Sequence, residues 1–289
     1  MLTEDPGRTA ALALLLEATS GPKPGNVDRD HDHDDATLHH FVASAHAVGP
    51  PLGRAAEAAT IGAAIEEATA AAGGHGGGNT HFGAILLLAP LVAAAGADDL
   101  LGGARRAVAG TTPDDAARFF AAFDHVDVAL PPVEELDGSA DIEGLDARDP
   151  ATRDRVRAED VTLEEVMRRS ADVDGVAREW TRGFPRTVAA ADRLDRHFDA
   201  DRVDASERAV VATTLDLLAE EPDTFVAKRH GEDVAREVVD RAAAVRDGEE
   251  RLEVLDAALV ERGINPGTTA DIVAGGLFVA LRRDGGFRV

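Results

Sequence analysis

A short loop near the start of the chain gathers side chains that can bind a metal ion. Most residues of 28–35 are Asp or His, and Asp28, His33 and Asp35 are candidate ligands. Hard cations such as Mg²⁺ bind carboxylate oxygens and retain several waters, so a few well-placed aspartates suffice. Lys23 stands between two prolines just before this loop and adds a cation. The combination indicates a site for metal and phosphate, with a solvated acidic loop as the plain alternative.

A glycine-rich stretch that ends at Gly78 leads through Asn79, Thr80 and His81 into an apolar run, residues 84–97. Glycine lets the backbone approach an anion closely, and a helix start presents unpaired N–H groups to it. We therefore expect Gly78, Asn79 and Thr80 to bind phosphate, with His81 at the mouth of the site. The Gly-Lys-Ser/Thr ending of a P-loop is missing, so a plain glycine linker is the alternative.

Two later segments carry the remaining chemically distinctive residues. Asp223 is a candidate metal ligand, and Arg229 follows it as a candidate phosphate contact. Gly267 opens the last long helix, and Asp271 lies early in it, where its charge opposes the positive end of the helix dipole. A charged helix end and an ordinary N-terminal acid explain these two patterns equally well.

The charge and composition of the chain indicate the salt content of its surroundings more clearly than they indicate a binding partner. The chain carries a net charge of −24 that is spread along its 289 residues, and only Lys23 and Lys228 of its 30 basic residues are lysines. A dense carboxylate surface stays hydrated at high salt, which screens its self-repulsion, so we expect adaptation to high salt. Non-specific binding to nucleic acid or anionic lipid needs a basic face, and we expect neither partner.

Several further classes are excluded by residues that are missing. Without cysteine the chain has no disulfide, no thiolate zinc site and no cysteine nucleophile. The acidic start lacks the apolar core of a signal peptide, and the apolar run 84–97 is too short to span a membrane. We expect a soluble, cytoplasmic protein.

Helical periodicity dominates the chain and predicts an all-α fold. Apolar residues recur at helical spacing in most segments, and alanine is abundant. We expect one domain over residues 1–289, built as a bundle of about ten to twelve helices. Residues 126–130 form the best short strand candidate, and the acidic, proline-containing segment 131–150 is expected to be a surface excursion.

Taken in order, these segments resemble the triphosphoribosyl-dephospho-CoA synthase family. The resemblance runs from residue 22 to about residue 281, although residues 98–175 contribute little to it. The matching segments are Pro22-Lys23-Pro24-Gly25-x-Val27-Asp28-Arg29, His33-Asp34-Asp35, Asn79-Thr80-His81-x-Gly83, Glu179 with Gly183-Phe184-Pro185, Asp223-Thr224 with Arg229-x-Gly231, and Pro266-Gly267-x-x-Ala270-Asp271.

The resemblance implies an all-α enzyme that uses Mg²⁺ to move the 5-triphosphoribosyl group of ATP to the 2′-hydroxyl of 3′-dephospho-CoA, with release of adenine. It implies catalytic roles for Asp28, His81 and Asp35, without separating the base from the acid. The implied contacts to substrate or phosphate are Lys23, Arg29, Gly78, Asn79, Thr80, Glu179, Arg229 and Gly267. The implied metal ligands are Asp28, His33, Asp35, Asp223 and Asp271.

Four positions depart from the family pattern. The family lysine after Asn-Thr-His is Phe82 here, an asparagine is Phe225, an aspartate is Thr37 and a serine is Asn265. Losing a cation and gaining two aromatic rings changes the expected pocket. These departures put the exact acceptor in doubt more than they do the fold or the nucleotide chemistry.

Three alternatives remain open at this point. A divergent member of the family transfers a related phosphoribosyl group to or from another cofactor precursor. The doublets His31-Asp32 and His33-Asp34 resemble those of all-α metal-dependent nucleotide phosphohydrolases. A non-catalytic nucleotide-binding protein is the third alternative, and a homodimer is compatible with each of them.

Overall fold

The computed structural model confirms the all-α class. It describes residues 5–32, 36–58, 60–74, 78–126, 145–147, 149–283 and 286–289. These described residues form fifteen helices and no strand, which is more than the ten to twelve helices predicted. Within the same ranges, no helix is both long and apolar enough to cross a membrane. Most of the strand candidate and of the predicted excursion, residues 127–144, lies outside the described residues.

The additional helices come from breaks that helical periodicity does not reveal. Gly183 and Phe184 both have positive φ, of 75° and 66°, and they separate α9 from α10. Gly231, with a φ of 91°, separates α12 from α13. A left-handed residue ends a helix while the apolar pattern continues beyond it. Segments that resemble one long helix in sequence are therefore two short ones.

The chain divides into two compact units. The first contains residues 1–11 and 43–184, and the second contains residues 12–42 and 185–289. Two helices contribute residues to both units, and they are α1 (Pro6–Thr19) and α2 (Leu38–Ala58).

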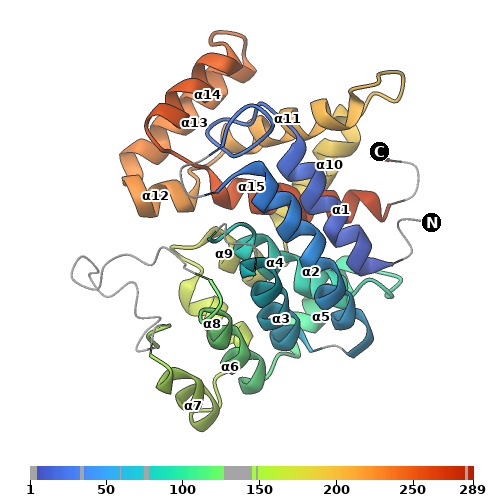
Figure 1. Ribbon diagram of the computed structural model, residues 1–289, viewed down its shortest axis with the longest axis vertical. Coiled ribbons are helices and arrows are strands. Elements are labelled where there is room, and N and C mark those ends of the chain that lie inside the picture. The colour runs from blue at the N-terminus through green and yellow to red at the C-terminus, as the bar shows by residue number, and fades with distance from the viewer. Residues whose placement is uncertain are drawn as a thin grey trace. The chain divides into compact units, whose positions relative to one another are not determined.

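An apolar helix, α4 (Phe82–Ala93), forms the core of the first unit. Every residue from Ala84 to Val92 is buried, as expected for a helix that is apolar on all sides. The helices α3, α5 and α9 pack against it, and α6 packs against α3, α7 and α8 (Figure 1). The bounds are α3 (Ile61–Gly73), α5 (Leu100–Ala109), α6 (Pro113–Ala122), α7 (Ala151–Ala158), α8 (Leu163–Ser170) and α9 (Gly175–Arg182).

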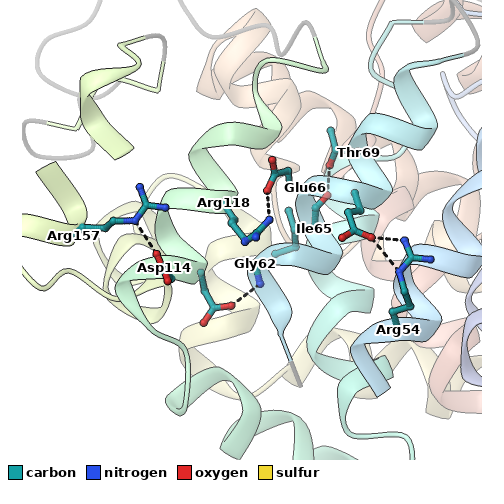
Figure 2. Close-up of polar contacts among 10 residues, drawn as sticks. Arg54, Gly62, Ile65, Glu66, Thr69, Asp114, Arg118 and Arg157 are labelled. Atoms are coloured by element: carbon teal, nitrogen blue, oxygen red, sulfur yellow. Dashed lines mark hydrogen bonds and ion pairs between the residues drawn. The ribbon is translucent and has the colours of Figure 1, made fainter. Parts of the chain in front are cut away.

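Carboxylates join neighbouring helices of this unit, as Figure 2 shows. Asp115 closes a capping box with Thr112 at the start of α6, and it also accepts the Gly62 N–H of α3 at 2.8 Å. Arg118 pairs with Glu66 at 2.8 Å, across the same two helices. Exposed pairs of this kind each contribute about 0–1 kcal/mol, so the shared cap matters more than the ion pair.

A second apolar helix, α15 (Gly267–Leu281), is central to the second unit. All of its residues from Ile272 to Leu281 are buried, and α10, α11 and α12 pack against it. The remaining bounds are α10 (Pro185–His197), α11 (Ala205–Leu218), α12 (Thr224–His230), α13 (Glu232–Arg246) and α14 (Leu252–Glu261). Gly276 allows α10 to approach closely, because a Cβ there would lie 2.5 Å from the Cβ of Ala190.

We predict that Gly276→Ala destabilises the protein despite the higher helix propensity of alanine. Overpacking of a tight contact costs about 1–3 kcal/mol, whereas alanine returns only about 1 kcal/mol. The matched control is Gly96→Ala, because a Cβ at Gly96 meets nothing within 4 Å. Chemical denaturation should show a lower midpoint for Gly276→Ala and an unchanged one for Gly96→Ala. Equal midpoints for the two variants would contradict the close approach of α10.

Candidate functional site

The loop at residues 21–31 is shaped by one carboxylate, that of Asp28. Its Oδ2 accepts the Lys23 N–H at 2.9 Å, and its Oδ1 accepts the N–H of Asp30 at 2.8 Å and of His31 at 3.3 Å. The Asp28 residue is 1% exposed. This candidate catalytic and metal-binding residue therefore has three backbone donors bound to it and determines how the loop folds.

The ammonium group of Lys23 lies inside the second unit. Lys23 is completely buried, and its Nζ donates to the carbonyl oxygen of Glu17 at 2.6 Å and to the Glu17 carboxylate. A buried charge requires a partner of this kind, and removing one partner of such a pair costs about 3–5 kcal/mol. Lys23, which was predicted to contact phosphate, holds the end of α1 against the loop.

Gly25 brings this loop against the segment that leads into α15. Its φ is 72°, and a Cβ there would collide with the Ile264 carbonyl oxygen. A side chain at this position is excluded both by the left-handed conformation and by the close approach. The motif around Lys23 and the motif that begins at Asn265 are thus neighbours in the second unit.

Asp223 fastens α12 to α15. Its Oδ1 accepts the N–H groups of Phe225 and Val226, and its Oδ2 accepts the N–H and the hydroxyl of Thr269, all within 3.1 Å. Complete burial raises the pKa of Asp223 above its ordinary value, although these hydrogen bonds oppose the shift. A carboxylate has about four acceptor positions, and all four are filled by protein donors. Asp223 thereby joins two predicted motifs, and Asp271 lies half-buried further along α15.

Two arginines of the predicted set lie at the surface of the second unit. Arg29 is exposed and pairs with Glu207 at the start of α11. Arg229 is exposed, and its guanidinium lies 5.6 Å from the centre of the Phe225 ring. A Cβ on Gly267 would lie 3.3 Å from that ring, so the start of α15 packs directly against it.

In the first unit, the Asn-Thr-His segment forms the start of α4. Asn79 accepts the Phe82 N–H at 3.1 Å through its side-chain oxygen. Thr80 donates its hydroxyl proton to Ser44 of α2 at 2.8 Å. His81 is the N-cap residue and is only 3% exposed. Gly78 has a positive φ of 59°, as a sharp turn before a helix requires.

Glu179 lies on α9, which packs against α4. It is 2% exposed, and its neighbour Trp180 donates Nε1–H to the Leu86 carbonyl oxygen at 3.0 Å. Glu179 thus lies on α9 and His81 caps the start of α4, and these two helices are in contact.

Phe82 lies in a cluster of rings. Its ring centre is 5.2 Å from that of Phe123 and 6.2 Å from that of Phe119, and the residue is 8% exposed. Replacement of the family lysine by Phe82 thus adds to the core of the first unit. The expectation that this change alters the pocket stays a prediction.

The metal ligands predicted for the loop are only partly described. His33 and Asp35 lie outside the described residues. Across the described ranges, no group of three His, Asp or Glu side chains is placed to hold a metal ion. Asp28 and Asp223 are already occupied by backbone and hydroxyl donors, as above. Binding of Mg²⁺ stays a prediction.

Some residues that contribute to the site were not predicted from the sequence. Glu17 and Asp256 are buried acids inside helices, and Ser44 and Thr269 are the partners of predicted residues. Burial raises the pKa of Asp256, while its hydrogen bond from Gly25 lowers it. A usable signal existed for Asp256, because it follows Leu252 by four residues and so shares the apolar face of α14.

Fold and motifs together define an all-helical transferase that acts on nucleotides. More specifically, the chain belongs to the CitG family of ATP:dephospho-CoA triphosphoribosyl transferases, whose model matches residues 3–287. The activity of this family is transfer of the triphosphoribosyl group from ATP to dephospho-CoA.

A solved structure agrees with this assignment. The crystal structure of a proposed triphosphoribosyl-dephospho-CoA synthase from Archaeoglobus fulgidus shares 28% sequence identity with the chain, at a TM-score of 0.68. The match covers 86% of this chain and 99% of the other. No curated protein matches the chain.

We predict that Asp223→Ala destabilises the second unit by more than the loss of an ordinary cap. The cap itself contributes about 0.5–2 kcal/mol, and the buried donors of Thr269 left without an acceptor add about 1–3 kcal/mol. Asp99→Ala is the control, because Asp99 is an exposed cap that accepts one N–H, from Gly102 at 2.9 Å. Equal losses of unfolding free energy for the two variants would show that Asp223 does not link the helices.

Proposed function

We propose that this chain transfers the 5-triphosphoribosyl group of ATP to the 2′-hydroxyl of 3′-dephospho-CoA and releases adenine. The bond from C1′ of ATP to adenine breaks, and a bond from C1′ to the acceptor oxygen forms. The hydroxyl proton passes to a base on the protein, and adenine takes up a proton as it leaves. The observation that carries this proposal is the family match over residues 3–287.

The reacting carbon gains oxocarbenium character, as in glycoside hydrolysis. Carboxylates and oriented backbone groups stabilise such charge best when they are held in place before the reaction. We assign the binding of the triphosphate to the loop at residues 21–31 and to the adjoining start of α15. The internal hydrogen bonds of Asp28 and the burial of Gly25 support this assignment, because they hold the loop in one shape.

Exposed arginines are the cations available to the triphosphate in the second unit. Lys23 is buried and committed to Glu17, whereas Arg229 is exposed and the ion pair of Arg29 with Glu207 lies at the surface, where a phosphate can compete for the guanidinium. Arginine presents a planar fork of donors that matches phosphate oxygens. The family resemblance implied phosphate contacts for Lys23, Arg29 and Arg229. We assign this contact to Arg29 and Arg229 and not to Lys23.

We assign the proton-transfer role to His81 as the candidate base. Its burial at the start of α4 limits access of bulk water to the imidazole. General base catalysis of this kind contributes about 10²–10⁴-fold to a rate. Glu179, on the helix packed against α4, remains the candidate contact to substrate in the first unit.

Dependence on Mg²⁺ is part of the proposal. Protein-bound Mg²⁺ commonly has one or two carboxylate ligands and takes the rest from substrate phosphates and water. Of the predicted ligands, His33, Asp35 and Asp271 would hold it, because Asp28 and Asp223 are engaged by protein donors. When bound, the ion neutralises charge on the triphosphate.

The test is mass spectrometry of the products formed from ATP, Mg²⁺ and dephospho-CoA in high salt. We expect equal amounts of free adenine and of an acceptor that has gained the triphosphoribosyl group, and neither product after addition of EDTA. Reactions without acceptor are the control and should release no adenine. Release of inorganic phosphate instead of adenine would favour a phosphohydrolase, and adenine release without acceptor would contradict the transfer.

We predict that Arg229→Ala raises KM for ATP by about 10-fold or more, since a hydrogen bond to a charged group contributes about 1.5–3 kcal/mol. Lys228→Ala is the matched control, because Lys228 is an exposed neighbour in α12 and its substitution removes the same charge from the same helix. Steady-state kinetics at fixed salt should show a change in KM for Arg229→Ala alone. Equal changes for both variants would reduce the role of Arg229 to general electrostatics.

A further inference from the structure

Asp256 is a buried carboxylate that none of the predicted motifs contains. It lies on the apolar face of α14, next to Leu255 and near Leu259, and it is 2% exposed. Burial of an ionisable group without partners is strongly unfavourable, so its contacts must offset this cost. Those contacts lead to the loop at residues 21–31.

Two residues of that loop, Gly25 and His31, reach the same carboxylate. The Gly25 N–H donates to Oδ1 of Asp256 at 2.9 Å, across 231 residues of sequence. Nδ1 of His31 lies 3.3 Å from Oδ2 of the same side chain. The Asp28 carboxylate accepts N–H groups of Lys23, Asp30 and His31, which all belong to the loop, so Asp28 sets the shape of the loop and Asp256 sets its position on α14.

The loop packs closely against its surroundings at Gly25. A Cβ on Gly25 would lie 2.9 Å from Cβ of Leu259 and would collide with the carbonyl oxygen of Ile264. The backbone at Gly25 therefore rests directly on the end of α14 and on the segment that leads to α15. A loss of the Asp256 contact would shift the loop relative to the start of α15.

We propose that Asp256 is a positioning residue for triphosphoribosyl transfer, acting through Gly25 and His31 on the loop at residues 21–31. This proposal rests on the proposed function, in which that loop binds the triphosphate of ATP. Misplacement of a binding group by about 1 Å can cost about 10²-fold in rate, so the anchoring of the loop has a kinetic consequence.

Two substitutions separate geometry from charge. Asp256→Asn keeps an oxygen that accepts the Gly25 N–H, so we expect kcat/KM for ATP within about threefold of wild type. Asp256→Glu keeps the charge but moves the carboxylate by one methylene, so we expect kcat/KM to fall by at least about tenfold, as does Asp256→Ala. The opposite order, with Glu active and Asn inactive, would overturn positioning in favour of a charge effect.

Asp195 provides the matched control in the same unit. Its carboxylate accepts the Phe287 N–H at 2.8 Å and pairs with Arg283 at 3.1 Å, so it also holds a backbone segment and a cation. We expect Asp195→Ala to lower thermal stability without a comparable fall in kcat/KM. Equal falls for Asp195→Ala and Asp256→Glu at equal stability would overturn the specific role of Asp256.

Hydrogen exchange measured by mass spectrometry gives a readout that does not depend on activity. We expect faster exchange in peptides that span residues 20–32 for Asp256→Glu, and wild-type exchange there for Asp256→Asn and Asp195→Ala. Unchanged exchange in Asp256→Glu would overturn the anchoring. A wild-type protein that forms no transfer product would overturn the proposed function and the catalytic consequence, whereas the exchange comparison would still decide the anchoring.

Discussion

A charge removed from water must find its partner inside the protein, and this constraint organises the second unit. Lys23 is completely buried and is matched by Glu17 of α1. Asp28, Asp223 and Asp256 are likewise buried, and each accepts backbone N–H groups from a loop or from the first turn of a helix. Breaking one such contact leaves a buried donor or charge without its partner, which is costly. These contacts therefore hold the segments of the second unit together.

These contacts explain why chemically distinctive residues can be structural as well as functional. The loop at residues 21–31 is fixed by Asp28 from within and by Glu17 and Asp256 from two helices. Asp223 in turn fixes the starts of α12 and α15. Backbone groups that are already in place can meet a charged substrate with little reorganisation, which is what a transfer through an oxocarbenium-like state requires.

The fold class and the motifs were predictable because they depend on local pattern. Helical periodicity and alanine content indicate the all-α class, and the motifs around Asp28 and His81 carry the family resemblance. The buried partners depend on tertiary contacts instead. Glu17 lies in a helix whose leucines at positions 12, 15 and 16 point to a different face from the fully buried Ala13 and Leu14. Phe82 similarly belongs to a ring cluster completed by α6, which sequence spacing does not show.

The ion pairs of the acidic surface contribute little to stability. Arginine rather than lysine forms nearly all of the ion pairs between described residues, and most of these pairs are exposed. Such pairs are screened by salt and contribute little individually. The stability of the two units therefore rests on apolar helices such as α4 and α15 and on the buried carboxylates. Adaptation to high salt stays a prediction.

In the proposed reaction, buried carboxylates hold a loop whose backbone then receives the nucleotide. A crystal structure of the protein with Mg²⁺, a non-reactive ATP analogue and dephospho-CoA tests it most directly. We expect the triphosphate to contact the loop at residues 21–31 while Lys23 stays paired with Glu17 and the Gly25 N–H stays bound to Asp256. A triphosphate bound away from this loop, or a loop that releases Asp256 to bind it, would show that the buried carboxylates do not prepare the loop for the nucleotide.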